Sequence, residues 1–300
     1  MIQEGKDAVN TGKIIKGVGG FYTVRYDDGK LCTCKARGLF RKTGETPLPG
    51  DDVEFVLDNK GQGYIMRILP RRNALLRPAV ANVDKLLIVI AATEPQPDLE
   101  LVDKLLLYCK KLGIAPVLVI NKCDGGDTAA LQHIRQYSGE CIPTVAVSAV
   151  SGFGMEALLK LLDGDTICLA GQSAVGKSSL LNALLGLSLE TGGLSRKTER
   201  GRHTTRHAEL LEMQNGSLIA DTPGFSMLES VPMEPEEIAD MYGEFKEHLG
   251  KCRFVGCLHL SEPDCAVKSA VRDGLIPTER YERYKKIVNE ALEARRHKYD

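Results

Sequence analysis

A glycine-rich segment of the chain has the composition of a phosphate-binding loop. Residues 171–178 read G-Q-S-A-V-G-K-S; an apolar run at 166–170 precedes them and a helix-forming run at 179–185 follows. In this context the glycines let successive backbone N–H groups face one anion, and the start of the helix adds a partial positive charge. We expect Lys177 to reach the β- and γ-phosphates of a nucleotide and the Ser178 hydroxyl to ligate Mg²⁺. The predicted phosphate-binding residues are Gly171, Gln172, Ser173, Ala174, Val175, Gly176, Lys177, Ser178 and Ser179.

A second phosphate-side motif follows farther along the chain. The run 217–220 predicts a strand that ends on Asp221-Thr222-Pro223-Gly224. A carboxylate at such a strand end holds Mg²⁺, usually through water, and a glycine N–H approaches a γ-phosphate because no side chain blocks it. We therefore expect Asp221 and Gly224 to belong to the nucleotide site.

The tetrapeptide N-K-C-D at residues 121–124 indicates which base is bound. A carboxylate that accepts from guanine N1–H and from its 2-amino group makes a bidentate contact that adenine cannot make. In this interpretation Asp124 reads guanine, Asn121 braces the loop and the stem of Lys122 covers the ring. Residues 148–149, after the next predicted strand, suit a loop whose backbone N–H meets guanine O6. The predicted base-side residues are Asn121, Lys122, Asp124, Ser148 and Ala149.

A polar, basic segment at 195–206 separates the phosphate-binding loop from Asp221. It has no apolar periodicity, which is typical of a switch segment that a γ-phosphate and Mg²⁺ order. Thr204 or Thr205 is expected to supply a hydroxyl that ligates Mg²⁺, and the sequence does not choose between them.

The residue after D-T-P-G is Phe225, where many GTPases carry a glutamine that orients the attacking water. Phenylalanine has no group that does this. Either intrinsic hydrolysis is slow and a partner completes the site, or a residue such as His203 positions the water. The predicted catalytic residues are Lys177, His203, Thr204 and Thr205.

A cysteine–histidine cluster near the end of the chain predicts a metal site. The pattern C-x4-C-x-H-x5-C supplies three thiolates and one imidazole, a set that suits one closed, tetrahedral, structural Zn²⁺. The surrounding apolar content is small, so we expect the metal to supply much of the local folding free energy. The predicted ligands are Cys252, Cys257, His259 and Cys265.

A basic amphipathic helix is predicted at 281–298. Its cations either contact RNA or pack on the metal-binding region. They are Arg280, Arg283, Lys285, Lys286, Arg295, Arg296 and Lys298.

Three regions must position these residues, and their predicted bounds are 1–72, 73–230 and 231–300. The first contains short β-rich runs separated by turn signals, which predicts a small OB-type β-barrel with an RNA-binding role. Its aromatic residues either stack on bases or fill the barrel core, and two cysteines one residue apart are expected to be buried on one face. The aromatic residues are Tyr22, Tyr26 and Phe40, and the cysteines are Cys32 and Cys34.

The second region alternates strand and helix patterns, which predicts a doubly wound α/β domain. The apolar run 86–91 predicts a strand buried on both faces of a parallel sheet, and 99–112 has helical periodicity with Gly113 as a stop. The run 116–120 predicts the strand that carries the N-K-C-D motif at its end.

Whole-chain composition sets looser bounds. The formal net charge of −1 gives no overall attraction to nucleic acid, so an RNA-binding surface must be a local patch. No apolar stretch of about 18 residues is present, and the first residues lack an apolar core, so neither a membrane span nor a signal peptide is expected. Nine cysteines without a secretion signal favour a reducing compartment. We expect a cytoplasmic monomer without a membrane partner.

The order of the motifs is the reverse of that in ordinary GTPases, because the base reader at 121–124 precedes the phosphate-binding loop. The assembled order is β-barrel, N-K-x-D, S-A, G-x-x-x-x-G-K-S, H-T-T, D-T-P-G and C-x4-C-x-H-x5-C. Over nearly the whole chain this order resembles the bacterial ribosome small-subunit-dependent GTPase A family, whose GTPase domain is circularly permuted. Two departures are visible: Ala174 stands where the family often has glycine, and Arg206 follows Thr205 where many members have a third threonine.

The resemblance implies a circularly permuted P-loop GTPase domain between an N-terminal OB-fold barrel and a C-terminal, mainly helical zinc domain. It implies that the 30S ribosomal subunit stimulates GTP hydrolysis during its late maturation. It also implies contacts of the flanking domains with 16S rRNA, and it assigns the catalytic histidine to His203. GTP with Mg²⁺ and GDP are the expected nucleotides.

Two other functions fit parts of the pattern. One is a zinc-bearing RNA-binding protein that uses GTP only as a structural ligand, and the other is a P-loop kinase of small molecules. The permuted order adds a hypothesis of its own: it places the zinc domain directly downstream of the loop that senses the γ-phosphate, so the nucleotide state would reposition that domain.

Overall fold

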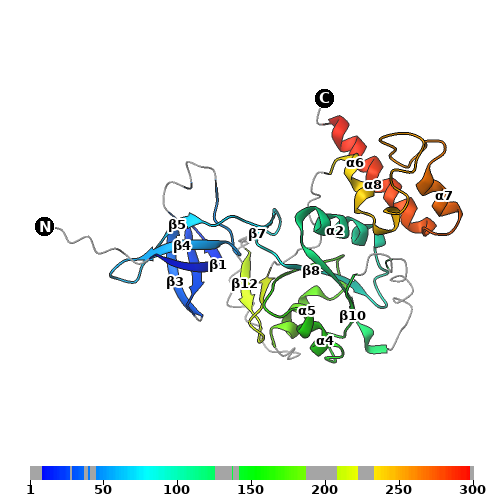
Figure 1. Ribbon diagram of the computed structural model, residues 1–300. Helices are drawn as coiled ribbons and strands as arrows, with labels where there is room; N and C mark the ends of the chain where they lie inside the picture. Colours follow the sequence, from blue (N-terminus) through cyan, green and yellow to red (C-terminus); the bar gives the residue numbers. More distant parts are fainter. Residues whose placement is uncertain are drawn as a thin grey trace.

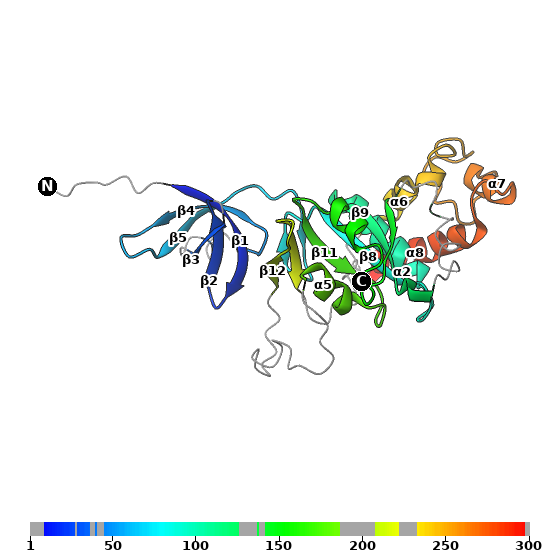
Figure 2. The same ribbon diagram turned by 90° about the horizontal axis from the view of Figure 1, so that it is seen from below.

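The computed structural model describes residues 9–27, 29–36, 40, 45–125, 137, 142–186, 208–221 and 233–297. They form an N-terminal barrel, a central sheet with helices and a C-terminal helical part (Figure 1). Seen from below, the barrel and the C-terminal part lie on opposite sides of the central sheet (Figure 2). Within the described part of the chain, none of the helices combines the length and the apolar character that crossing a membrane requires.

The N-terminal barrel closes through five strands in the order β1-β2-β3-β5-β4, with β4 pairing back to β1. The pairing of β3 with β5 is parallel and the other pairings are antiparallel. This strand order is that of the OB-fold barrel that the sequence predicted. The strands are β1 (Asn10–Val18), β2 (Phe21–Tyr26), β3 (Lys30–Ala36), β4 (Asp52–Leu57) and β5 (Gly63–Ile68).

The three barrel aromatic residues that the sequence singled out, Tyr22, Tyr26 and Phe40, pack in or against its core. Phe40 is 8% exposed, and Tyr22 and Tyr26 pack half-buried against the same apolar cluster. Both strand cysteines are also buried there, and the Sγ atoms of Cys32 and Cys34 lie 3.6 Å apart. The structure therefore favours the core over the stacking interpretation for these rings and confirms the shared face of the two thiols.

The central sheet has the order β10-β9-β8-β11-β13-β12. All of these pairings are parallel except that of β12 with β13. The apolar runs predicted as strands are buried along nearly their whole length, because helices cover both faces. The strands are β8 (Lys85–Ala91), β9 (Ala115–Asn121), β10 (Thr144–Ala146), β11 (Thr166–Ala170), β12 (Glu209–Glu212) and β13 (Leu218–Asp221).

Two apolar clusters hold the helices on the sheet. Helix α2 (Leu99–Leu112) packs on one face, where Leu105 and Leu106 meet the sheet. Helices α4 (Met155–Leu161) and α5 (Lys177–Leu184) pack on the other face. The predicted limits of α2 are confirmed: the Asp98 side chain accepts from Leu101 N at its start, and Gly113 ends it with a φ of 65°.

The C-terminal part is helical and has an apolar core of its own. The rings of Tyr242, Phe245 and Tyr284 pack within 5.2 Å of one another, centroid to centroid, in the middle of it. The expectation that this region lacks enough apolar content for a core was therefore wrong, because its aromatic residues are spread thinly along the sequence. Its elements are α6 (Pro235–Ile238), η3 (Ala239–Met241), η4 (Gly243–Phe245), α7 (Ala266–Arg272) and α8 (Thr278–His297).

The barrel meets the sheet through the turn before β4 and through one strand edge. The backbone N–H of Ala81, in the short hairpin of β6 (Ala74–Leu75) and β7 (Val80–Ala81), donates to Pro49 O at 2.8 Å. Strand β1 pairs with β12 at Lys16 and Glu209, whose side chains form an ion pair at 3.0 Å. The barrel is thus attached at two places, to the β6–β7 hairpin and to the edge strand β12 of the central sheet.

We predict that Gly50→Ala weakens this attachment. Gly50 has a φ of 92°, and an added Cβ would lie 1.9 Å from Ala81 O. Left-handed strain together with the backbone clash should lower the free energy of unfolding by about 3 kcal/mol or more. Gly61→Ala is the matched control, because its φ is 78° but nothing lies within 4 Å of an added Cβ. It should cost only about 1–2 kcal/mol. Equal losses for both variants in urea titrations followed by circular dichroism would contradict the clash.

Candidate nucleotide and metal sites

Two glycines of the phosphate-binding loop lie where no other residue fits. Gly171 follows β11 with a φ of 139°, and an added Cβ would lie 2.2 Å from Val89 O. Gly176 has a φ of 92°, and an added Cβ would lie 2.4 Å from Asn121 Nδ2. The loop therefore runs directly against the end of β8 and against the N-K-C-D motif, and glycine is needed for both approaches.

Ala174 also has a left-handed backbone, with a φ of 65°. An alanine in this conformation is strained by about 1–2 kcal/mol, which glycine avoids. The backbone thus accounts for the preference for glycine that the family resemblance attaches to this position.

Lys177 is the first residue of α5, two residues earlier than the predicted helical run. Its Nζ donates to Gly171 O and to Gln172 O, both at 2.6 Å, so its side chain folds back over its own loop. Burial lowers the pKa of Lys177 from its ordinary value. An anion at the loop would compensate for this desolvation, because it would place negative charge beside a partly buried ammonium group.

Asn121 joins the phosphate-binding loop to the base-side loop. It ends β9 and is 1% exposed. Its Nδ2 donates to Val175 O at 3.0 Å, while its Oδ1 accepts from Ala149 N at 3.1 Å. The two halves of the predicted site are therefore held together by one buried side chain, although they are far apart in sequence and in reversed order.

The base-side residues gather at the same edge. Asp124 is exposed, and one of its carboxylate oxygens accepts from the buried Ser148 hydroxyl. That hydroxyl in turn accepts from Ser151 N at 3.0 Å, which fixes the loop. Lys122 has a φ of 67°, and its Nζ donates to Glu94 O at 2.7 Å. An exposed carboxylate on a braced loop suits a base that arrives from solvent.

Asp221 ends β13, which runs parallel to β11 with Ile219 opposite Ile167. It is half-buried and lies on the same edge of the sheet as the phosphate-binding loop, where the carboxyl ends of parallel strands meet. This position fits an Mg²⁺ ligand acting together with Ser178. The other expectations fall on residues outside the described part of the chain, and they remain predictions: His203, Thr204, Thr205, Arg206, Gly224 and Phe225.

Residues 94–98 were not predicted to adjoin the site. They follow the carboxyl end of β8, and the side chain of Gln172 holds them. Its Nε2 donates to Gln96 O at 2.9 Å, and its Oε1 accepts from Asp98 N at 2.7 Å. The rule that ligands bind at the carboxyl edge of a parallel sheet could have identified this segment.

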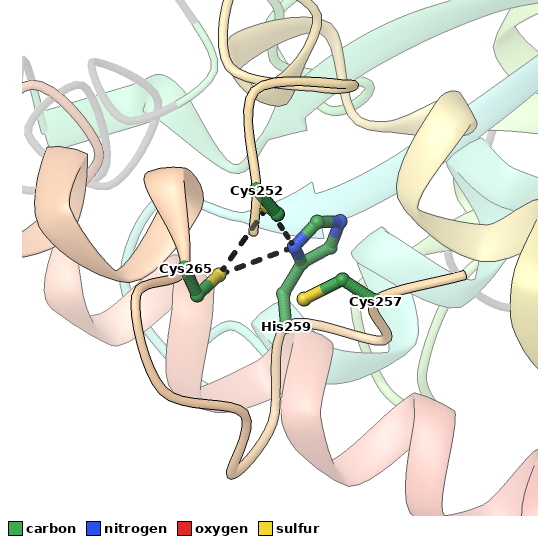
Figure 3. A group of neighbouring side chains, drawn as sticks. All are labelled: Cys252, Cys257, His259 and Cys265. Atoms are coloured by element: carbon green, nitrogen blue, oxygen red, sulfur yellow. Dashed lines mark hydrogen bonds between the residues drawn. The ribbon is translucent and has the colours of Figure 1, made fainter. Parts of the chain in front are cut away.

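The predicted metal ligands converge (Figure 3). The ligand atoms of Cys252, Cys257, His259 and Cys265 all lie within 4.8 Å of one another. Cys252 Sγ lies 3.8 Å from Cys265 Sγ and 3.5 Å from His259 Nδ1, and His259 Nδ1 lies 3.3 Å from Cys265 Sγ. Ordinary zinc bond lengths in a tetrahedron give about 3.8 Å between sulfurs and about 3.5 Å from sulfur to nitrogen. The donor set and its spacing therefore fit a closed tetrahedral metal site.

The aromatic core supports the loop that carries these ligands. The Tyr281 hydroxyl donates to His259 O and the Tyr284 hydroxyl to Leu258 O, each at 2.7 Å. Burial lowers the pKa of His259, which keeps the imidazole in its neutral, metal-binding form at neutral pH. Burial raises the pKa of the Cys257 thiol to about 12, so a bound cation is needed to hold it as thiolate.

Sequence comparisons match both the barrel and the central region of the chain to one protein family. The family model described as RsgA GTPase matches residues 68–231, and that described as RsgA N-terminal domain matches residues 11–65. The small ribosomal subunit biogenesis GTPase RsgA of Geobacillus sp. (strain WCH70) is 46% identical over 287 residues, which cover 94% of this chain and 97% of that relative. The protein of the same name from Caldanaerobacter subterraneus subsp. tengcongensis is 43% identical over 290 residues, 96% and 98% of the two chains.

Solved structures agree with the sequence comparisons. The crystal structure of YjeQ from Thermotoga maritima superposes with a TM-score of 0.81 at 38% identity, covering 95% of this chain and 99% of that one. YloQ, described as a circularly permuted GTPase, gives a TM-score of 0.79 at 34% identity, covering 98% of this chain and 99% of the other. The similarity thus extends over the barrel, the central sheet and the helical part together.

We predict that Cys265→Ser removes the bound metal. Its Sγ lies 3.8 Å from Cys252 Sγ and 3.3 Å from His259 Nδ1, and losing one of four ligands from a closed site weakens binding strongly. Elemental analysis should fall from about one metal ion per chain to well below that. Cys32→Ser is the matched control, because that thiol is also buried but lies in the barrel. Full metal content in Cys265→Ser would contradict the assignment.

Proposed function

The chain belongs to the RsgA GTPase family, and we propose on this basis that it hydrolyses GTP in the biogenesis of the small ribosomal subunit. The observation that carries the proposal is the position of Asn121. Its hydrogen bonds to the phosphate-binding loop and to Ala149 bring the reversed halves of the pattern into one site. This arrangement is the one expected of a GTPase, and the reversed order of its parts agrees with the circular permutation described for YloQ.

We assign the recognition of GTP and GDP to both halves of this site. Asp124 would accept from the guanine N1–H and 2-amino groups, with Ser148 orienting its carboxylate. A backbone N–H of the loop that begins at residues 148–149 would meet O6, and that of Ala149 would do so by exchanging Asn121 Oδ1 for the base. The loop from Gly171 to Ser179 would hold the phosphates through its backbone N–H groups, and Lys177 Nζ would exchange its carbonyl partners for phosphate oxygens.

For the hydrolytic step we propose Mg²⁺ held by Ser178 and, usually through water, by Asp221. A bound Mg²⁺ supplies charge that stabilises the transferring phosphoryl group. His203 is the proposed group that positions water, and Thr204 or Thr205 the proposed switch ligand. Phe225 follows D-T-P-G in place of a glutamine, which supports a slow intrinsic rate and a partner that completes the site.

We propose that the barrel and the C-terminal module bind 16S rRNA on the 30S subunit, and that the chain acts as a cytoplasmic monomer.

Zn²⁺ is the proposed metal, because three thiolates and an imidazole in a closed tetrahedron favour it over harder cations. The proposed domain limits are 1–72, 73–230 and 231–300. Separate apolar clusters in the barrel, on the two sheet faces and in the C-terminal helices support this division.

Two cations of the basic helix α8 are excluded from RNA binding in this proposal. Arg280 and Arg283 are 2% and 9% exposed and pack against the GTPase domain, which removes them from any RNA-binding surface.

Neither alternative function has comparable support. No observation on the described residues points to an acceptor for a kinase, and use of GTP as a structural ligand alone would leave the catalytic pattern without a role.

We predict slow hydrolysis of GTP by the protein alone and faster hydrolysis with purified 30S subunits. Lys177→Ala should lower the stimulated rate by about 100-fold or more, because it removes a cation from the phosphoryl group. The matched control is Lys160→Ala on α4, whose exposed side chain pairs with Glu156 at 2.7 Å. His203→Ala should keep nucleotide affinity and lose most of the stimulated rate. Absence of stimulation by 30S subunits would refute the ribosomal part.

We predict that Asp124→Asn changes base preference from guanine to xanthine. The amide retains an acceptor for N1–H and donates to the 2-oxo group of xanthine, whereas two charge-assisted bonds to guanine are lost, at about 2–4 kcal/mol in total. Competition binding with GDP and xanthosine diphosphate measures this. Asp163→Asn, an exposed carboxylate after α4, is the control and should leave GDP affinity unchanged. An unaltered preference in Asp124→Asn would remove Asp124 as base reader.

A further inference from the structure

Helix α2 makes contacts on two sides. It lies between the central sheet and α8 in both views (Figures 1 and 2). The residues of α2 in the sheet core include Val102, Leu105, Leu106 and Cys109. The residues of α2 that contact the C-terminal module are Glu100, Asp103, Lys104, Leu107, Lys110 and Lys111. Their spacing follows the helical period, so the outer face of α2 is the platform on which the C-terminal module sits.

Asp103 is the centre of this platform, and it is 1% exposed. Its Oδ1 accepts from Arg280 Nη1 at 2.5 Å and from the Tyr137 hydroxyl at 2.7 Å, and its Oδ2 accepts from Arg283 Nε at 2.7 Å. Arg280 also pairs with Glu244. Removing one partner from such a buried network leaves an uncompensated charge, so a change at Asp103 should weaken the contact between α2 and α8.

The N-terminal end of α2 is fixed to the nucleotide site. Asp98 caps the helix, and its backbone N–H donates to Gln172 Oε1 at 2.7 Å. Gln172 Nε2 donates to Gln96 O at 2.9 Å, and Lys122 Nζ donates to Glu94 O at 2.7 Å. Segment 94–98 is therefore held by one residue from the phosphate-binding loop and one from the base-side loop.

A bound phosphate would also alter the surroundings of the Gln172 backbone. Its carbonyl accepts from Lys177 Nζ at 2.6 Å. Phosphate oxygens carry full negative charge and compete with this carbonyl for the ammonium group. A bound nucleotide would thus draw Lys177 Nζ away from the Gln172 carbonyl. The side chain of the same residue accepts from the backbone N–H of Asp98, the residue before α2.

We propose that Gln172, segment 94–98, helix α2 and Asp103 form a relay that links occupancy of the nucleotide site to the orientation and mobility of the C-terminal module. In this relay Gln172 and Asp103 are positioning residues. The route is separate from the covalent connection after D-T-P-G that the permuted order suggested, because it passes through side-chain contacts between described residues. It rests on the proposed binding of nucleotide at residues 171–179.

Linkage makes the relay reciprocal. If nucleotide alters the state of the C-terminal module, then a partner that binds this module alters nucleotide affinity by the same factor. A ribosomal surface in contact with α8 would in this way act on the phosphate-binding loop without touching it.

The test uses amide hydrogen exchange of the full-length, metal-loaded protein, with and without GDP, alongside a direct titration of GDP affinity. In the wild type we expect GDP to change exchange in residues 278–288 of α8 by about 5-fold, a typical size for coupling between sites. In Gln172→Ala this response should be lost even at GDP concentrations that the titration shows to be saturating for that variant. Gln214→Ala, in the turn between β12 and β13, is the matched control and should respond as the wild type does.

Asp103→Asn provides a second test at the other end of the relay. It keeps the shape of the side chain and lies outside the binding machinery, so GDP should still bind while the response of α8 is lost. Full metal content then verifies that the C-terminal module is folded. GDP binding without a response of α8 in the wild type, or a retained response in both variants, would overturn the relay. Failure of the wild type to bind GDP at all would instead refute the proposed function, and the relay with it.

Discussion

Parallel pairing of β11 with β8 and β13 decides where the predicted nucleotide-binding residues meet. The carboxyl ends of these strands, and of β9 beside β8, lie on one edge of the sheet. Three of these four ends carry predicted site residues: Ala170 leads into the phosphate-binding loop, and Asn121 and Asp221 end their strands. The edge is defined by strand direction and not by the order of the strands along the chain. A permuted sequence therefore builds the same site, provided that the strands keep their directions and neighbours.

The same edge explains why the loops need particular residues. Gly171 and Gly176 let the phosphate-binding loop approach Val89 and Asn121 more closely than any Cβ allows. The amide of Asn121 then joins loops that lie on either side of it. Strand pairing brings the ends of these segments to the same edge of the sheet. The two glycines and the buried amide of Asn121 then determine how closely the loops approach one another.

The local chemistry of this protein was predictable from sequence, whereas the contacts between its parts were not. The phosphate-binding loop, the ends of α2 and the cysteine–histidine cluster depend on residues close in sequence, and short patterns specify them. Arg280 and Arg283 were predicted either to contact RNA or to pack on the metal-binding region, but they are buried on Asp103 of α2, a contact that no periodicity records. The aromatic core was missed for a similar reason, because Tyr242 and Tyr284 come from separate elements and meet only after folding.

The two flanking modules are attached to elements that adjoin different parts of the site. The barrel pairs through Lys16 with Glu209 on β12, and β12 leads through a hairpin to β13 and Asp221. The C-terminal module sits on α2, which begins at the segment that Gln172 holds. The Asp221 side of the proposed nucleotide site is therefore connected to the barrel through a strand, and the phosphate-binding loop is connected to the C-terminal module through a helix. Under the proposed function, a surface that contacted both modules would act on the two sides of this site by two separate structural routes.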